Sequence, residues 1–287
     1  DMSTDIHVIC KDLPSFSWWA FDGCAKQGRT HMHFEQVLEG RLVEAPRKTH
    51  QPAGKRLARD AADADALRQR INRSYLMDWS DSKVRRRLGE MAEATIEGAV
   101  AYVIDDTGIE KKGVKSPGVH RQYTGTAGKI TNCQVVVSTH LASHQASVPL
   151  EMDLYLPRAW CDDADRRREA RIPDDISFRS KPELALEQLD QLLDSGHGHR
   201  VVLADAGYGD NYAFRNGLTE RELPYAVGVT GTAKIWREGE GPDPPKEWSG
   251  RGRPPRRGFP GEHTPVEMRA FAREIAPSKW TDVDLRP

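Results

Sequence analysis

Two short apolar segments that each end at carboxylates constrain the fold of this chain more than any other feature. AYVIDDTG at 101–108 leads into Asp105 and Asp106, and VVLADAGYG at 201–209 leads into Asp205. Continuous apolar runs rich in β-branched residues are typical of strands buried on both faces. The small residues and glycine that follow each run predict a turn. Carboxylates at the ends of such strands lie where α/β proteins commonly have their active sites. A pair of these carboxylates can hold a hard divalent cation.

Only one of the two adjacent acids can face a site formed with Asp205. Neighbouring residues of a strand point to opposite faces. We favour Asp105 and keep Asp106 as the alternative, which applies if the turn begins there. One of the two acids could also serve only to cap the turn.

The order of predicted elements indicates the fold class. Strands are predicted over 100–104, 119–124, 132–141 and 146–156, followed by a helix over 181–195, a strand over 201–204, a helix over 211–222 and a strand over 224–229. A meander followed by a helix that crosses to a strand beside the first is the order of the ribonuclease H-like fold. We therefore expect an α/β class, with a mixed sheet flanked by helices and Asp105 close to Asp205.

The chain divides into three parts on composition. Residues 1–97 predict an all-α, basic, DNA-binding domain, with helices around 34–38, 57–75 and 81–91, although a merely solvated charged face would give the same pattern. Residues 98–232 form the predicted catalytic core. Residues 233–287 contain a Gly-, Pro- and Arg-rich insertion or linker and the start of a C-terminal part, with a short helix at 264–275.

Positive charge is concentrated locally although the net charge is only −1. Residues 111–150 contain no Asp or Glu, in a chain with 43 acids, but contain Lys111, Lys112, Lys115, Arg121 and Lys129. A phosphodiester substrate needs carboxylates to hold cations and basic side chains to hold flanking phosphates. Arg251, Arg253, Arg256 and Arg257 could also follow a phosphate backbone, or lie on a solvated linker.

Other functional classes lack support. The four cysteines form no CxxC or CxxH pair, so we expect a reduced cytosolic protein without a zinc site. No apolar run reaches the roughly 18 residues of a membrane span, and the acidic N-terminus lacks a signal-peptide pattern. Neither the P-loop spacing nor a GxSxG nucleophile motif occurs.

Several of these segments together resemble one family. YVIDDTGIEKKGVKSPGVHRQYTGTAGKITNCQVVV at 102–137 resembles the first catalytic block of bacterial DDE transposases, of the insertion sequence 701 group within the insertion sequence 4 type. The resemblance continues through LYLPRAWCDDADRRREARIP at 154–173, FRSKPELALEQLD at 178–190 and VLADAGYGDNYAFRNGL at 202–218. Residues 47–58 and 79–88 are similar to the family's N-terminal helical domain.

The resemblance implies metal-dependent DNA cleavage and strand transfer at insertion-sequence ends. Two Mg²⁺ ions, or Mn²⁺ in their place, would be bound by an acidic triad in which Asp105 matches the first acid and Asp205 the second. Lys111, Lys112, Arg121 and Lys129 would line the DNA channel. The implied partners are double-stranded DNA with terminal inverted repeats and a second copy of the chain on paired ends, at the bacterial nucleoid in the cytoplasm.

The sequence departs from the family at the third acid, a glutamate near a tyrosine–arginine–glutamate motif. Glu262, Glu267 and Glu274 have no matching context, so the third acid is expected beyond Pro287. Two alternatives therefore stay open: a non-catalytic DNA-binding regulator descended from a transposase, and a metal-dependent nuclease without strand transfer.

Overall fold

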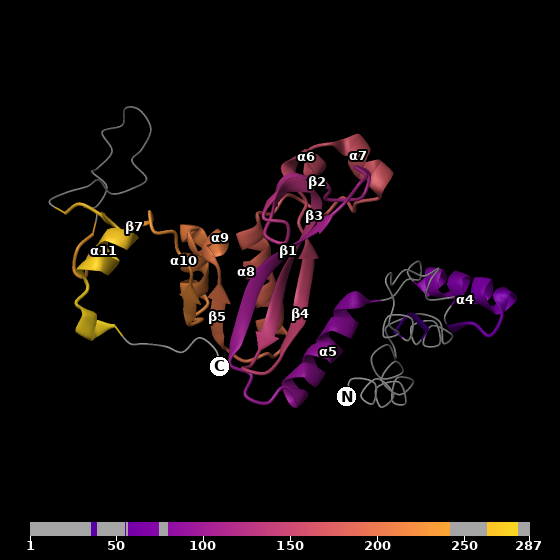
Figure 1. Cartoon of the computed structure of the whole chain (residues 1–287), viewed down its shortest axis with the longest axis horizontal. Helices are drawn as coiled ribbons and strands as arrows, with labels where there is room; N and C mark the ends of the chain where they lie inside the picture. Colours follow the sequence, from indigo (N-terminus) through magenta and orange to yellow (C-terminus); the bar gives the residue numbers. More distant parts are fainter. Residues whose placement is uncertain (1–35, 39–54, 56, 75–79, 242–262, 281–287) are drawn as a thin grey trace. The chain divides into compact units, whose positions relative to one another are not determined.

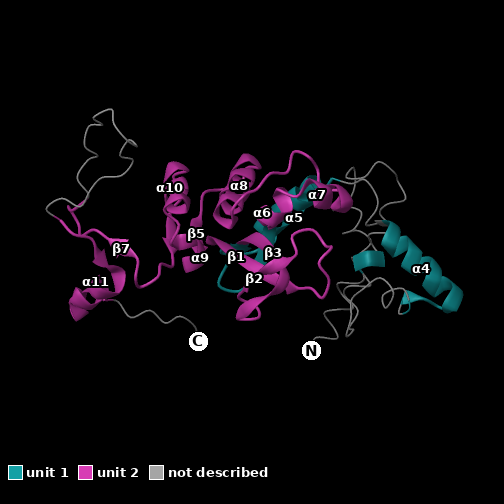
Figure 2. Ribbon diagram, turned by 90° about the horizontal axis from the view of Figure 1, so that it is seen from above, with its two compact units in different colours: residues 1–99, 141–151 teal, residues 100–140, 152–287 magenta. Residues whose placement is uncertain are grey.

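The computed structural model describes residues 36–38, 55, 57–74, 80–241 and 263–280. The chain forms two compact units, residues 1–99 with 141–151 and residues 100–140 with 152–287 (Figure 2). The predicted Arg251, Arg253, Arg256 and Arg257 contacts lie outside the described residues. No helix in the described ranges is long and apolar enough to cross a membrane.

The first unit includes the helices α4 (Ala61–Ser74) and α5 (Asp81–Thr95), both predicted from the sequence. Leu67 and Ile71 lie one helical turn apart and are buried. The Ser80 hydroxyl caps α5 by accepting a hydrogen bond from the backbone of Lys83 at 3.4 Å. Of the helix predicted around 34–38, residues 36–38 are described and are helical.

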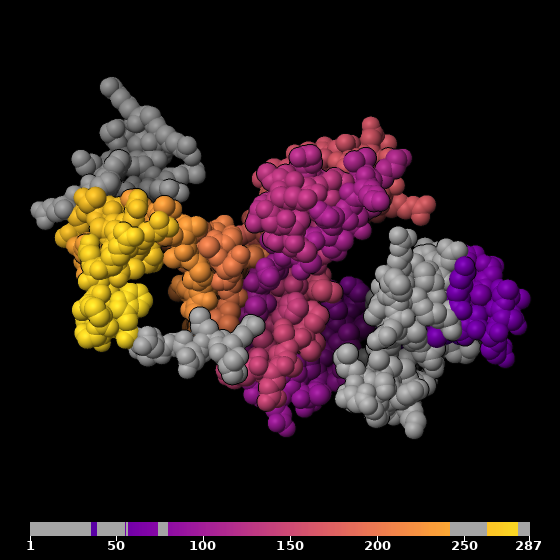
Figure 3. Space-filling view, in the orientation of Figure 1, coloured from indigo at the N-terminus to yellow at the C-terminus, as the bar shows by residue number. Residues whose placement is uncertain are grey.

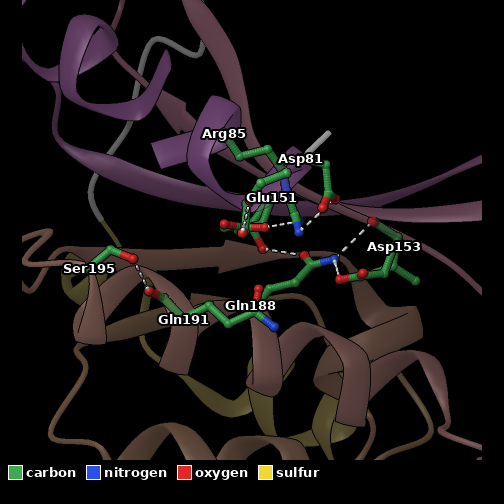
Figure 4. A network of polar contacts seen from close by, with 11 residues as sticks. Asp81, Arg85, Glu151, Asp153, Gln188, Gln191 and Ser195 are labelled. Atoms are coloured by element: carbon green, nitrogen blue, oxygen red, sulfur yellow. Dashed lines mark hydrogen bonds and ion pairs between the residues drawn. The ribbon is translucent and has the colours of Figure 1, made fainter. Parts of the chain in front are cut away.

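Helix α5 is tied to the middle of strand β4 (Ser147–Leu154) by an ion pair within the first unit (Figure 4). Arg85 pairs with Glu151, and it also contacts Asp81 one turn earlier at 3.2 Å. The side chains of Arg85 and Glu151 are only 25% and 11% exposed. Removing one partner of a pair this buried would leave an uncompensated charge, so the contact fixes the end of the helix.

A six-stranded mixed sheet contains the predicted strands. In addition to β4, the sheet contains β1 (Ala101–Glu110), β2 (His120–Thr124), β3 (Lys129–Ala142), β5 (Val201–Ala204) and β6 (Tyr225–Val227). The order is β2-β3-β1-β5-β6, with β4 paired to β3. Strand β5 is parallel to both β1 and β6, and β2 is antiparallel to β3. The strand after the long helix thus lies beside the first, as predicted, and the arrangement is consistent with a ribonuclease H-like fold.

Helices flank this sheet (Figure 1). They are α6 (Arg158–Cys161), α7 (Ala164–Ala170), α8 (Lys181–Asp194), α9 (Ala206–Gly209) and α10 (Tyr212–Glu220). A capping box between Ser180 and Glu183 starts α8, with proline in its first turn, and Asn211 caps α10. Helices α8 and α10 contact each other. The second unit's core includes Tyr102, Ile104, Val135, Val137, Leu189, Leu192, Val202, Phe214 and Leu218.

The predicted end of the first strand was wrong. Strand β1 does not stop at a turn after Ile104 but continues through both acids and Gly108 to Glu110. It continues because β3 is long enough to pair beside it, and the backbone of Lys111 still donates to Asn132 O at 2.9 Å. Gly108 is needed there for space, because a Cβ would overlap the side chain of Thr124.

Two strands near the end of the described chain were not predicted. Strands β7 (Lys234–Ile235) and β8 (Val266–Glu267) pair in antiparallel fashion, and helix α11 (Met268–Glu274) follows. Arg237 pairs with Glu274 at 2.6 Å across this small motif. Each strand has only two residues, which is too short for an alternating pattern to be recognised.

One glutamine of α8 satisfies several buried polar groups of the sheet (Figure 4). The Nε2 group of Gln188 donates to Val137 O at 3.0 Å and to Asp153 Oδ2 at 2.8 Å. Its Oε1 accepts from the Thr139 hydroxyl at 2.8 Å, and both Gln188 and Thr139 are fully buried. Gln188 therefore holds α8 on the sheet by hydrogen bonds.

We predict that Gln188→Leu lowers the free energy of unfolding by about 2–4 kcal/mol, because it leaves buried polar partners unsatisfied. Urea unfolding would measure the change. Gln191→Leu, an exposed position on the same helix, is the matched control and should change stability by less than about 0.5 kcal/mol. Equal effects of the two substitutions would contradict this role for the buried network.

Candidate active site

Asp105 and Asp205 follow the last paired residues of two adjacent parallel strands. The register between β1 and β5 runs from Ala101↔Val201 to Ile104↔Ala204. Paired residues of parallel strands point to the same face, and neighbouring strands lie about 4.8 Å apart. The next residues, Asp105 and Asp205, therefore start from neighbouring positions on one face of the sheet, and both are exposed.

Hydrogen bonds within the protein occupy only some of the oxygens of these two carboxylates. Asp105 Oδ1 accepts a hydrogen bond from the backbone of Asp106 at 2.7 Å. Asp205 caps α9, and its Oδ1 accepts from the backbone of Gly207 at 2.9 Å. Within the described ranges neither acid has an ion pair with a basic side chain. Two exposed carboxylates with open oxygens on one face suit a hard divalent cation.

Asp106 has a different environment. Its side chain points to the opposite face of β1, and its Oδ2 accepts from Lys181 Nζ at 2.8 Å. Lys181 is the first residue of α8, so this ion pair joins the helix to the strand. Because Asp106 is already neutralised by a partly buried lysine, the geometry favours Asp105 as the partner of Asp205.

A buried tyrosine lies close to all three acids. Tyr208 is almost fully buried, and its ring packs at a tilt against Phe214 with centroids 5.7 Å apart. Burial raises the pKa of its hydroxyl far above the usual range, and the negative charges of Asp106, Asp105 and Asp205 raise that pKa further. The phenol therefore stays protonated.

The Tyr208 hydroxyl has no hydrogen-bond partner within the described part of the chain. Buried hydroxyls are normally satisfied, and an exception indicates a place for water or an ion. An orphaned donor close to the three acids leaves a place for a water molecule, such as one that hydrates a bound cation. The sequence analysis assigns no role to Tyr208, because its burial beside the acids follows from the fold and not from a local pattern.

Among the described residues, no group of three or more His, Cys, Asp or Glu side chains is placed to hold a metal. His140 lies near Asp105, and its Nε2 is 3.1 Å from the Ser138 hydroxyl. Burial lowers the pKa of His140, while the charge of Asp105 raises it. Burial thus favours the neutral imidazole, and Asp105 counteracts part of that effect.

The turn that carries Asp205 packs closely against the segment after β6. A Cβ on Gly209 would overlap the carbonyl oxygen of Gly228, and Gly228 donates to Ala204 O at 2.9 Å. A Cβ on Gly228 would in turn lie 3.0 Å from the backbone nitrogen of Ala206. The sequence indicated a glycine turn here, but the actual requirement is close contact between two backbone segments.

The predicted DNA-contact residues within the described ranges differ in their partners. Lys115 Nζ is 2.8 Å from Glu169 Oε1, although both side chains are exposed. This carboxylate raises the pKa of Lys115. Four others form no ion pair with another residue of the described ranges: Lys111, Lys112, Arg121 and Lys129. Lys111 is half-buried and the other three are exposed.

Comparison with known proteins identifies the family of the chain. The family described as DDE superfamily endonuclease matches residues 21–287. The chain belongs to this family. It is also 31% identical over 153 residues to the "Probable transposase for insertion sequence element IS701" of Microchaete diplosiphon. That alignment covers 53% of this chain and 37% of the relative's length. The resemblance of this DDE-family chain to transposases of the insertion sequence 701 group is thereby confirmed.

We predict that Gly209→Ala lowers the free energy of unfolding by about 1–3 kcal/mol, because the added methyl forces two backbone segments apart. Thermal unfolding followed by circular dichroism would measure it. Gly125→Ala is the control, since a Cβ at Gly125 meets no atom within 4 Å. A Gly209→Ala protein as stable as the control would show that the contact with Gly228 does not constrain this turn.

Proposed function

We propose that this chain cleaves phosphodiester bonds in DNA and transfers the resulting ends, as a transposase, with divalent cations held by Asp105 and Asp205. Mg²⁺ is the expected ion, with two ions per site and Mn²⁺ as a substitute. Family membership supports a DDE endonuclease activity. The observation that carries the site assignment is the register of β1 and β5, which brings the two exposed acids to neighbouring positions.

The protein groups have separate roles in this proposal. Bound divalent cations would activate a water molecule or a 3′-hydroxyl and stabilise the leaving oxygen. Asp105 and Asp205 supply carboxylate ligands and leave positions for water, DNA oxygens and a further protein ligand. Asp106 and Lys181 keep β1 fixed against α8, which orients Asp105. Tyr208 offers a protonated hydroxyl beside the acids.

The substrate in this proposal is double-stranded DNA with terminal inverted repeats, bound by a pair of chains on paired ends. Lys111, Lys112, Arg121 and Lys129 contact its phosphates. Phosphate contacts of this kind set the register of the duplex without reading its sequence. Their position after the first acid, in a stretch without Asp or Glu, supports this assignment.

We predict that Asp105→Asn and Asp205→Asn each weaken Mg²⁺ or Mn²⁺ binding by about tenfold or more, because each removes an anionic ligand. Both should reduce nicking of duplex DNA that carries the element's ends to background. Isothermal titration calorimetry would measure cation binding, and gel analysis of labelled strands would measure cleavage.

Two further variants sharpen this test. Asp194→Asn removes an exposed carboxylate at the end of α8 and should leave cation affinity unchanged. Asp106→Asn should lower thermal stability through loss of the Lys181 ion pair, with a smaller effect on cation affinity than Asp105→Asn. A cation affinity that depends on Asp106 but not on Asp105 would reverse our assignment. Salt-dependent DNA binding without metal-dependent cleavage would instead favour a non-catalytic DNA-binding regulator.

A further inference from the structure

The segment Lys111–Val119, which we call the basic loop, follows β1 directly and is held through its backbone. Its carbonyl oxygens accept hydrogen bonds at most positions. Asn132 Nδ2 donates to Lys111 O at 2.7 Å and to Gly113 O at 2.9 Å. Gln134 Nε2 donates to Pro117 O at 2.6 Å. The donors come from β3, so the sheet itself fixes one side of the loop.

Arg166 of α7 holds the other side. Its Nη2 donates to Val114 O at 2.9 Å and to Val119 O at 3.4 Å. Its guanidinium lies 3.6 Å over the ring of Trp160, which is fully buried. The indole Nε1 of Trp160 also donates to Val119 O at 2.8 Å. A planar guanidinium can stack on an aromatic ring and bridge two carbonyls at the same time, whereas a lysine ammonium cannot.

The side chains of this fixed loop are basic. Lys111 and Lys112 have no recorded ion pair in the described ranges, and the loop contains no acid. Lys115 is already paired with Glu169 of α7 and so adds a second link between the loop and that helix. The segments that carry the loop and α6–α7 lie next to each other on the surface (Figures 1 and 3).

The distance from the acids suits a duplex. Lys111 lies six residues beyond Asp105 along an extended strand, which is about 20 Å at about 3.3 Å per residue. DNA rises about 3.4 Å per base pair, so this separation is about six base pairs. For a duplex that lies along β1, contacts there would hold the backbone about half a helical turn from the bond at the acids.

We infer that the basic loop is a preformed binding segment for the backbone of duplex DNA, and that Arg166 is the residue that positions it. This inference rests on the proposed function, because it assumes that DNA is the substrate. A loop already fixed in the free protein loses less conformational entropy on binding than a flexible one. Arg166 bonds the Val114 and Val119 carbonyl oxygens, so it would position Lys111 and Lys112 only through the backbone of the loop. Its own guanidinium is occupied by these oxygens and by Trp160.

The test measures binding of the 287-residue chain to a fluorescein-labelled 25-base-pair duplex of arbitrary sequence, in EDTA, over a series of salt concentrations. We expect Lys111→Ala/Lys112→Ala to reduce the slope of log K against log salt by about two, about one per lost phosphate contact. Arg166→Lys keeps the positive charge, yet its slope of log K against log salt should fall by most of the same amount. Arg168→Lys, an exposed neighbour on α7 whose recorded partner is Asp165, should match the wild type.

A double-mutant cycle separates positioning from general destabilisation. Adding Arg166→Lys to the double-alanine protein should not change the slope further. In the Arg166→Lys single variant, amide hydrogen exchange of residues 111–119 should be faster than in the wild type. If Arg166→Lys lowers the melting temperature of the whole chain, the slopes are compared at a temperature at which both proteins are fully folded. Trp160→Phe, which removes the indole donor together with part of the buried ring, is a second variant with the same expected result.

Two results with the variants would overturn the inference. One is a wild-type slope in Arg166→Lys. The other is that Arg166→Lys lowers the slope by the same amount whether or not Lys111 and Lys112 are present. Lack of salt-dependent binding by the wild type would also overturn it. Because these measurements are made without metal, their failure is distinguishable from failure of the cation site at Asp105 and Asp205.

Discussion

The parallel pairing of β1 with β5 is the constraint on which the candidate site depends. The pairing brings together two strands that lie about a hundred residues apart in the sequence, and its register decides which side chains share a face. A shift of one residue would move Asp105 to the other face and bring Asp106 beside Asp205. The acids can therefore act together only while Ile104 lies opposite Ala204.

Several contacts within the second unit keep that register in place. Lys181 ties the start of α8 to Asp106, and Gln188 ties the middle of the same helix to β3 and β4. Gly209 and Gly228 allow the turn after β5 to pack on the segment after β6. Each contact uses a polar or glycine residue whose loss would leave a buried group unsatisfied or force backbone segments apart. The rigidity of the site thus comes from the residues around the acids more than from the acids themselves.

The sequence predicted the helices α4, α5, α8 and α10 and the position of β5 beside β1, because these follow from periodicity and from element order. It predicted a meander of consecutive strands, whereas β3 and not β2 lies next to β1 in the sheet. It did not predict that β1 continues to Glu110, because pairing with β3 overrides the local turn signal of Thr107 and Gly108. Nor did it predict the link between Lys115 and Glu169, which lie far apart in the chain. The sequence did not predict the roles of Trp160 and Arg166, because local composition does not reveal a contact with the basic loop.

Anomalous diffraction from crystals of the full chain grown with Mn²⁺ would test the central claim most directly. We predict a peak within bonding distance of a carboxylate oxygen from both Asp105 and Asp205, on the face of the sheet opposite Lys181. A peak bound by Asp106 in place of Asp105, or fully occupied Mn²⁺ sites elsewhere with none between Asp105 and Asp205, would contradict the account.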